Sequence, residues 1–344
     1  MTDISLALYR KYRPHTFADV RNQDHIVSVL QGALKKQMIP HALLFTGSRG
    51  TGKTTVARIF AHAVGAHDVD IYEMDAASNR GIDDIRELKE SVHTVPYESP
   101  YKVYIIDEVH MLTKEAFNAL LKTLEEPPSH VIFILATTEK DKLLDTITSR
   151  CQVFEFHAPT RAELRETVID IAKKEKFTID TAAADVIALS ADGSYRDALG
   201  ITQKVMLASG DTTLTSDEVA EIIGAPKSVI LEDLMIALGT KDLERGLEAL
   251  RKAMEAHVDV KLLYRLLLER IRSVILVRHN PGSANTVSLQ YGERERDLIS
   301  TYAKETASPL NSHLLQKALE IGSYIGKSTV PVLPIELLLL EHCK

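Results

Sequence analysis

The sequence predicts an α/β fold in which helices cover a parallel β-sheet, followed by an all-helical C-terminal part. Three observations support this prediction. Short apolar segments typical of strands alternate with segments of helical periodicity up to about residue 158. The segment at 131–136 is almost continuously apolar and that at 101–106 mostly so, as expected for parallel strands that are covered on both faces. From about Pro159 onward the periodicity is purely helical.

Five segments are predicted to be strands: residues 42–46, 69–74, 101–106, 131–136 and 153–156. Helical spacing of apolar residues fills the intervals between them. It begins at about Asp24, after Thr54 and at Ile82, and it also runs from Phe117 to Leu124. Strands separated by helices in this order describe βαβ units, so we expect one parallel sheet of five strands.

The C-terminal helices divide into two predicted domains. Thr160 with Glu163, and Thr215 with Glu218, fit the capping-box pattern of helix starts. A boundary is expected at residues 224–226, where Gly-Ala-Pro interrupts the helical pattern. The domain after it could be an independent bundle or an oligomerisation domain, and the pattern does not separate the two. We therefore expect three domains: an α/β domain at 1–158, a small helical domain at 159–225 and an all-helical domain at 226–344.

Residues 47–54 read GSRGTGKT and match the pattern G-x-x-x-x-G-K-[ST] between a predicted strand and a predicted helix. Backbone N–H groups of such a loop surround phosphates, Lys53 would pair with the β- and γ-phosphates, and Thr54 would offer its hydroxyl to Mg²⁺. A Gly-rich turn with a chance lysine is the alternative, but the flanking strand and helix argue against it. The sequence therefore predicts a nucleoside triphosphate site formed by Gly47, Ser48, Arg49, Gly50, Thr51, Gly52, Lys53, Thr54 and Thr55.

Two carboxylates end the predicted strand at 101–106. Asp107 can hold Mg²⁺, usually through water, and Glu108 can polarise the water that attacks the γ-phosphate. Adjacent side chains on a strand point in different directions, so the pair can serve both tasks. An acid-rich helix N-terminus is the alternative. Because the pair follows the phosphate-binding pattern by about fifty residues, we interpret it as part of a hydrolytic site.

Three further features have more than one interpretation on the residues alone. A hydroxyl of Thr137 or Thr138, after a predicted strand, could bind the γ-phosphate or its attacking water, or cap the next turn. Arg150 fits a basic residue in a last helical turn. Arg196 lies in the first turn of a predicted helix, where a cation opposes the helix dipole. A nearby anion, or Asp197, would compensate it.

The N-terminal segment and one arginine are candidates for phosphate contacts. Residues 6–23 interleave two tyrosines with four basic residues, which suits either a surface patch for nucleic acid or a segment that closes over the nucleotide. Arg80 precedes the helix at Ile82, where its charge and the helix N–H groups could meet DNA phosphates; a solvated arginine is the alternative. Because the net charge is −7, any nucleic-acid contact must come from a local basic surface.

Composition argues against several classes of protein. The chain has 344 residues, of which 45% are hydrophobic and 26% charged, as in ordinary globular proteins. It has neither a long apolar run for a membrane span nor a secretory signal pattern. Cys151 and Cys343 are far apart, which argues against a disulfide framework or a cysteine zinc site and fits a reducing cytoplasm. Four polar residues of a short connector are interpreted as solvated, not as metal ligands: His62, His67, Asp68 and Asp70.

Six motifs occur in an order that resembles a known family. They are GSRGTGKT, YIIDEVHML, FNALLKTLEEPP, LATTE, SRC and GSYRDAL. In this order they resemble bacterial DNA polymerase III subunit gamma/tau, the ATPase of the sliding-clamp loader in the AAA+ superfamily. The resemblance runs from about Leu8 to the C-terminus. It implies an AAA+ P-loop NTPase fold with a parallel sheet, then a small helical lid domain and an all-α C-terminal collar domain.

The resemblance also implies roles for residues that spacing leaves open. Thr138 is similar to the sensor-1 residue, and Arg196 resembles sensor 2, which contacts the γ-phosphate from the lid. Arg150 in SRC looks like the arginine finger that reaches a neighbouring subunit's ATP, a contact that is worth about 10³–10⁵ in rate. Three N-terminal residues fall where the family surrounds the adenine and ribose: Tyr9, Arg13 and Val20.

The chain departs from the family pattern in two places. The family usually inserts a cysteine-rich zinc module after the phosphate-loop helix, whereas residues 64–68 contain no cysteine, so we expect no zinc. The chain also stops where the collar should end. The extensions by which the long tau form contacts polymerase and helicase are absent, so we expect a gamma-like or truncated form.

By this resemblance the chain is an ATPase motor subunit that uses ATP and Mg²⁺ to open the sliding clamp and load it onto primer-template DNA in replication. Implied partners are other gamma/tau copies, the delta and delta-prime subunits, the clamp and the DNA, but no membrane. They work in the cytoplasm within the DNA polymerase III holoenzyme, a DNA-directed DNA polymerase and nucleotidyltransferase. The alternatives are another AAA+ DNA remodeller, such as a branch-migration motor or helicase loader, and a non-hydrolysing scaffold like delta-prime. Intact Lys53, Thr54, Asp107 and Glu108 argue against the scaffold.

Overall fold

The computed structural model describes residues 6–280, 282, 293–305 and 307–344. The chain forms two compact units, Met1–Lys204 and Val205–Lys344. The division falls inside helix α9 (Tyr195–Ala208). It lies away from the predicted domain limits after residues 158 and 225, and those limits stay predictions.

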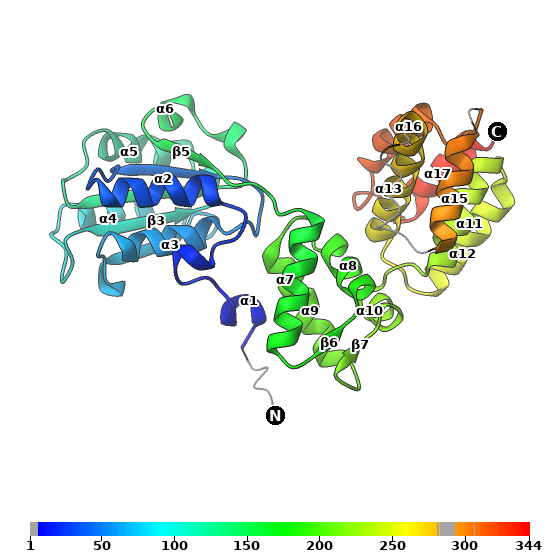
Figure 1. Cartoon of the computed structure of the whole chain (residues 1–344). Helices are drawn as coiled ribbons and strands as arrows, with labels where there is room; N and C mark the ends of the chain where they lie inside the picture. The colour runs from blue at the N-terminus through cyan, green and yellow to red at the C-terminus, as the bar shows by residue number, and fades with distance from the viewer. Residues whose placement is uncertain (1–5, 281, 283–292, 306) are drawn as a thin grey trace. The chain divides into compact units, whose positions relative to one another are not determined.

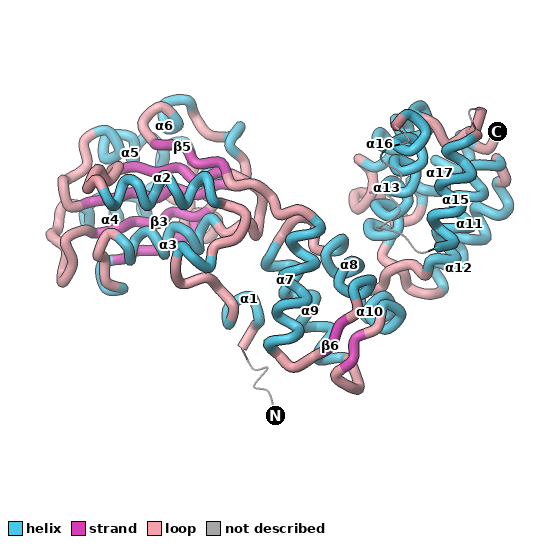
Figure 2. Tube along the Cα trace, in the orientation of Figure 1, coloured by secondary structure: helices cyan, strands magenta, loops and turns pink. Residues whose placement is uncertain are grey.

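A five-stranded parallel sheet forms the centre of the first unit (Figures 1 and 2). In chain order the strands are β1 (Ala42–Thr46), β2 (Ile71–Asp75), β3 (Lys102–Asp107), β4 (Val131–Thr137) and β5 (Gln152–Glu155). Across the sheet their order is β2-β3-β4-β1-β5, and every neighbouring pair is parallel. The predicted α/β fold with a parallel five-stranded sheet is confirmed, and each strand end lies within two residues of its predicted place.

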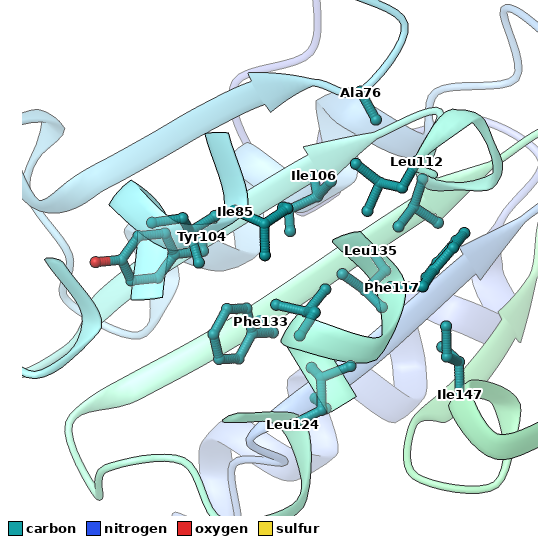
Figure 3. Close-up of a cluster of buried hydrophobic side chains, with 14 of the residues drawn as sticks. Ala76, Ile85, Tyr104, Ile106, Leu112, Phe117, Leu124, Phe133, Leu135 and Ile147 are labelled. Carbon is teal, nitrogen blue, oxygen red and sulfur yellow. The ribbon is translucent and has the colours of Figure 1, made fainter. Parts of the chain in front are cut away.

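Helices cover both faces of the sheet. They are α2 (Asp24–Lys35), α3 (Lys53–Ala63), α4 (Ile82–Val92) and α5 (Lys114–Glu125). Alternate residues of a strand point to opposite faces. Tyr104 and Ile106 of β3 pack with α4 and α5 on one face (Figure 3), while Val103 and Ile105 pack with α2 and α3 on the other. This two-sided burial explains why the three inner strands β1, β3 and β4 are mostly apolar, whereas the edge strands β2 and β5 are largely exposed.

Shorter elements and a helical part complete the first unit. The short elements are α1 (Leu8–Lys11), η1 (Phe17–Asp19), η2 (Asp68–Asp70), η3 (Val109–Met111), η4 (Lys140–Lys142), α6 (Asp145–Thr148) and β6 (Thr178–Ile179). Helix α7 (Arg161–Lys174) packs against α8 (Thr181–Ser190). The predicted capping box of α7 is confirmed. Thr160 Oγ1 accepts a hydrogen bond from Glu163 N–H, and the Glu163 carboxylate accepts one from Thr160 N–H.

The described part of the second unit is helical apart from one short strand. Its elements are β7 (Thr213–Leu214), α10 (Ser216–Ile223), α11 (Ser228–Thr240), α12 (Leu243–Glu255), α13 (Val260–His279), α15 (Glu293–Lys304), α16 (Ser312–Gly322) and α17 (Leu333–His342). Helix α11 packs on α12, and α13 packs on α15 and α16. At the start of α10, Thr215 Oγ1 accepts from Glu218 N–H, which is one of the two hydrogen bonds of the predicted capping box. None of the helices in the described ranges is long and apolar enough to cross a membrane.

The connector between α3 and β2 differs from its prediction at Asp70. The interpretation as a solvated residue holds for Asp68, whose side chain is 93% exposed, but it is wrong for Asp70, which is 1% exposed. The Asp70 carboxylate accepts hydrogen bonds from three successive backbone N–H groups, those of Tyr97, Glu98 and Ser99, at 2.6, 2.9 and 3.0 Å. Burial alone would raise the pKa of Asp70, but these hydrogen bonds outweigh burial and lower it.

We expect Asp70→Asn to destabilise the protein by about 2–3 kcal/mol at pH 7, because the amide leaves buried N–H donors without an acceptor. The lowered pKa of Asp70 means that its contribution is complete above the unfolded-state pKa of about 3.9 and is lost as the pH falls further. Urea unfolding of both proteins should therefore differ at pH 7 and converge at lower pH. The exposed Asp68→Asn is the matched control, and it should change stability by less than about 0.5 kcal/mol. Equal stability of Asp70→Asn and the parent protein at pH 7 would contradict this account.

Candidate nucleotide-binding site

The loop between β1 and α3 needs glycine at specific positions. Gly47, Gly50 and Gly52 have φ values of 141°, 76° and 103°, in the region that favours glycine. A Cβ atom at Gly47 would lie 2.5 Å from the carbonyl oxygen of Phe156, and one at Gly50 would lie 2.0 Å from Ser194 Oγ. The loop therefore packs closely against its surroundings on two sides and turns directly into α3 at Lys53.

Lys53 lies inside this loop. It is 5% exposed, and its Nζ donates to the carbonyl oxygens of Gly47 and Ser48 at 2.8 and 2.9 Å. Burial lowers the pKa of Lys53, and the charges of Glu108 and Asp107 partly offset this effect. A buried cation surrounded by loop carbonyls is poorly solvated, so an anionic phosphate group is a favourable partner for it.

The two predicted magnesium ligands are in direct contact. Thr54 Oγ1, in the first turn of α3, donates to Asp107 Oδ2 at 2.6 Å, at the carboxyl end of β3. Within the described ranges no group of three or more His, Cys, Asp or Glu side chains is arranged to hold a metal ion. The Thr54–Asp107 pair nevertheless fits Mg²⁺, which prefers oxygen ligands and usually takes the rest from phosphates and water.

Glu108 is held beside this pair by the end of β4. Its Oε2 accepts from Thr138 Oγ1 at 2.9 Å and from Thr138 N–H at 3.3 Å. The two threonines at this strand end have different contacts. Thr137 Oγ1 accepts from Glu139 N–H at 3.0 Å and so caps the next turn, whereas Thr138 contacts the candidate water-polarising glutamate.

The sequence predicts no role for His110, although this residue lies in the YIIDEVHML motif. Its side chain is 5% exposed. Its Nδ1 lies 2.9 Å from Thr137 Oγ1 and 3.4 Å from Glu108 Oε2, and its Nε2 lies 3.3 Å from a Glu139 carboxylate oxygen. The only sequence signal was its place two residues after Glu108, in the turn η3, and the partner residues come from another strand end.

The helical part that begins at α7 and includes the start of α9, called the lid below, contacts the phosphate loop, and the N-terminal segment contacts α3. The Tyr195 N–H at the start of α9 donates to the Gly50 carbonyl at 3.1 Å. The Arg196 guanidinium lies 5.8 Å from the ring centroid of Tyr9. Arg13 Nε donates to Thr55 Oγ1 at 3.0 Å in α3. Two of the N-terminal residues predicted to surround the adenine and ribose therefore contact the region of the loop. Tyr9 lies beside Arg196, and Arg13 is hydrogen-bonded to the helix that follows the phosphate loop.

Arg13 also has charged neighbours of both signs. Burial lowers its pKa, as do the cations Arg58 and Arg196, while Glu73 and Asp107 oppose them. Val20, the third residue predicted to surround the adenine and ribose, packs at the edge of the core on the α2 and α3 face of the sheet, and its nucleotide contact stays a prediction.

A second set of contacts fixes the N-terminal segment to the lid. Glu175, which follows α7, is 1% exposed. It accepts from Lys11 Nζ at 2.6 Å and from the Tyr12 hydroxyl. Burial would raise the pKa of Glu175, but these two hydrogen bonds lower it, whereas burial and Glu175 raise the pKa of Tyr12 to about 12. Arg21 adds hydrogen bonds to Thr167 and Asp170 of α7.

Arg150 and Arg80 belong to other parts of the surface. Arg150 follows α6, and its side-chain hydrogen bonds go to Glu125 and to the Thr146 carbonyl, not to the phosphate loop. Arg80 is exposed just before α4, and its carbonyl accepts from Thr113 N–H at 3.1 Å.

The sheet, the phosphate loop, the carboxylates at the end of β3 and the helical lid together define an AAA+ ATPase fold. The RuvB Holliday junction branch migration motor of Thermotoga maritima is similar in fold, with a TM-score of 0.53 and 23% identity over 66% of this chain and 79% of that chain. Family models match successive parts of the chain: the DNA polymerase III delta subunit at 65–160, the ATPase lid domain of the DNA polymerase III clamp loader subunit at 163–210, and domain III of the gamma and tau subunits at 214–344.

Curated relatives agree with these matches. DNA polymerase III subunit tau of Bacillus subtilis is 40% identical over 297 residues, which cover 80% of this chain and 53% of that protein. The Escherichia coli tau subunit is 34% identical, covering 92% and 51%. The gamma subunit of Buchnera aphidicola is 32% identical over 338 residues, covering 92% of this chain and 86% of that protein. The chain belongs to the DNA polymerase III gamma/tau family, and it spans about half the length of the tau relatives.

Proposed function

We propose that this chain is an ATPase motor subunit of the DNA polymerase III clamp loader. In this proposal it binds and hydrolyses ATP with Mg²⁺ to open the sliding clamp and load it onto primer-template DNA. The main support is the contact of Thr54 with Asp107 beside the Glu108–Thr138 pair. A phosphate loop followed by Thr54, with Asp107 of β3 as a second oxygen ligand and a carboxylate held for a water molecule beside them, is suited to hydrolysis rather than to binding alone.

Each residue of the site has a separate task in this proposal. The loop N–H groups and Lys53 bind the phosphates, and Thr54 and Asp107 hold Mg²⁺, which neutralises phosphate charge when bound. Glu108 orients the attacking water and accepts its proton, while Thr138 fixes the Glu108 carboxylate. Arg196 reaches the γ-phosphate from the lid, and the N-terminal segment with Tyr9, Arg13 and Val20 closes the nucleotide site. No zinc takes part.

Arg150 acts outside its own chain in this proposal. It completes the ATP site of a neighbouring gamma/tau copy in a ring with the delta and delta-prime subunits. Its position in a cluster apart from Lys53 and Glu108 supports this assignment. We assign nucleotidyl transfer to the polymerase of the holoenzyme, and ATP hydrolysis alone to this chain. We place the assembly in the cytoplasm.

The deciding experiment measures ATP hydrolysis by the isolated chain and by the chain assembled with delta, delta-prime, clamp and primed DNA. The isolated chain should be a poor ATPase, because catalysis depends on the neighbour's arginine. Primed DNA with clamp should stimulate the assembly, because both are the substrates of the proposed loading reaction. A motor of another class would instead respond to DNA without the clamp. Absence of any stimulation in the full assembly would rule out the loader function.

Arg80→Ala should weaken DNA binding by the assembled loader to a similar degree on all sequences, because a phosphate contact carries no base information. The slope of log affinity against log salt should fall by about one. Fluorescence anisotropy with primed DNA at several salt concentrations measures both. Arg86→Ala is the matched control, since Arg86 lies nearby on α4 but is paired with Asp83 at 2.7 Å. An unchanged salt slope in Arg80→Ala would show that Arg80 is a solvated arginine that does not contact DNA.

A further inference from the structure

The guanidinium group of Arg150 is held by two neighbours. Its Nε donates to Glu125 Oε1 at 2.7 Å, and its Nη2 donates to the same carboxylate oxygen. Its Nη1 donates to the Thr146 carbonyl at 2.6 Å, one helical turn back in the chain. Glu125 is the last residue of α5, so it fixes the arginine from a separate element of the fold.

These contacts leave two N–H donors of the Arg150 guanidinium available. Arginine has five N–H donors, and the three contacts use one each on Nε, Nη1 and Nη2. One N–H therefore remains on Nη1 and one on Nη2. Because a single Glu125 oxygen accepts from both Nε and Nη2, the remaining Nη2 donor lies on the opposite side, at the free end of the guanidinium. Terminal N–H donors of this kind match the oxygens of a phosphate group.

Exposure suggests that the pair contributes to function more than to the fold. The Arg150 and Glu125 side chains are 32% and 45% exposed, and ion pairs this exposed usually contribute little to stability. A direct contact with Glu125 does, however, restrict the rotamers of a long side chain. The adjacent Glu126 is also exposed, and across the described ranges its side chain has no hydrogen bond or ion pair.

We propose that Glu125 is a positioning residue for Arg150. It holds the guanidinium from the side, so that the free end is directed in advance for the phosphates of ATP bound to a neighbouring copy. This inference rests on the proposed function, in which Arg150 acts between subunits. Without Glu125 the arginine has to lose its rotamer freedom in each catalytic cycle, which slows the reaction without affecting how tightly ATP binds.

The test uses the assembled loader with clamp and primed DNA. Glu125→Ala should lower kcat for ATP about tenfold, the scale set by the rotamer freedom of an arginine side chain. KM for ATP, ATP binding by the isolated chain and the melting temperature should not change. Glu125→Gln keeps a carbonyl acceptor and should lower kcat less. Glu126→Ala, the matched control, should leave kcat unchanged.

A double-mutant cycle separates this inference from the proposed function. In an Arg150→Ala background, Glu125→Ala should cause no further fall in kcat, because Glu125 acts only through Arg150. An additive fall, a rise in kcat, or an unchanged kcat in Glu125→Ala alone would overturn the positioning role while leaving the proposed function in place. If Arg150→Ala itself left the assembly's rate unchanged, the arginine finger of the proposed function would fail, and the positioning role with it.

Discussion

Replacement of Arg150 by alanine is expected to slow ATP hydrolysis by the assembled loader by about 10³-fold or more, within the 10³–10⁵ range of arginine fingers. The loss is large because the guanidinium neutralises charge that develops on the phosphates in the transition state, at a site where water offers little compensation. ATP binding by the isolated chain should not change, since Arg150 contacts Glu125 and Thr146 and not its own phosphate loop. Steady-state hydrolysis and equilibrium ATP binding measure the two effects.

Mixed assemblies test whether Arg150 acts between chains. An Arg150→Ala chain keeps its own phosphate loop, and a Lys53→Ala chain keeps its arginine. Loaders that contain both chains should hydrolyse ATP faster than loaders built from either chain alone, because the second chain supplies an arginine to the first. Failure of the mixture to recover activity, or loss of ATP binding by the isolated Arg150→Ala chain, would place Arg150 in its own site.

Glu108→Gln is expected to slow hydrolysis by about 10²–10⁴-fold, the usual contribution of a general base, while ATP binding persists. Glutamine has nearly the same shape and keeps an oxygen that can accept from Thr138, but it cannot take a proton from water. Single-turnover hydrolysis by the assembled loader measures the chemical step, and equilibrium binding measures ATP affinity.

Glu115→Gln is the control for this change, because Glu115 is an exposed glutamate in the first turn of α5. It should leave both the rate and the affinity unaltered. Normal turnover in Glu108→Gln would remove the water-polarising role. A loss of ATP binding would show that Glu108 maintains the shape of the site instead.

Local sequence pattern was sufficient to predict much of the fold. The inner strands were found because burial on both faces leaves an apolar run that ends abruptly at a polar residue, such as Asp107, the last residue of β3. Strand order was not predicted, because it depends on pairing between segments far apart in the chain. Asp70 was misinterpreted for a similar reason, since its partners are the backbone N–H groups of residues 97–99, which carry no side-chain signal.

The residues of the candidate site also divide into those with a local sequence signal and those that depend on contacts between distant segments. The phosphate loop and the Asp107–Glu108 pair are contiguous motifs, so the sequence alone indicated them. The different contacts of Thr137 and Thr138 depend on the direction in which each side chain leaves the end of β4. Glu125 and Glu175 had no local signal, and His110 had only its place two residues after Glu108, because their importance comes from contacts with other segments, such as that of Tyr12 with Glu175, 163 residues apart.

The attachment of the N-terminal segment has a mechanical consequence. Lys11 and Tyr12 are bonded to Glu175 in the lid, and Arg13, the next residue, is bonded to Thr55 in α3. Consecutive Cα atoms are about 3.8 Å apart, so the residue that is bonded to α3 cannot move far from the two residues that are bonded to the lid. We call residues 11–13 the tether. A swing of the lid by more than a few ångströms has to break one attachment.

The weaker attachment is the one between Arg13 and the neutral Thr55 hydroxyl, because Lys11 and Glu175 are both charged and Tyr12 adds a second hydrogen bond to the same carboxylate. The tether would therefore detach from α3 first and travel with the lid. Opening the lid would carry Tyr9 and Arg13 away from the phosphate loop in the same movement, so that nucleotide release and lid opening become a single mechanical event.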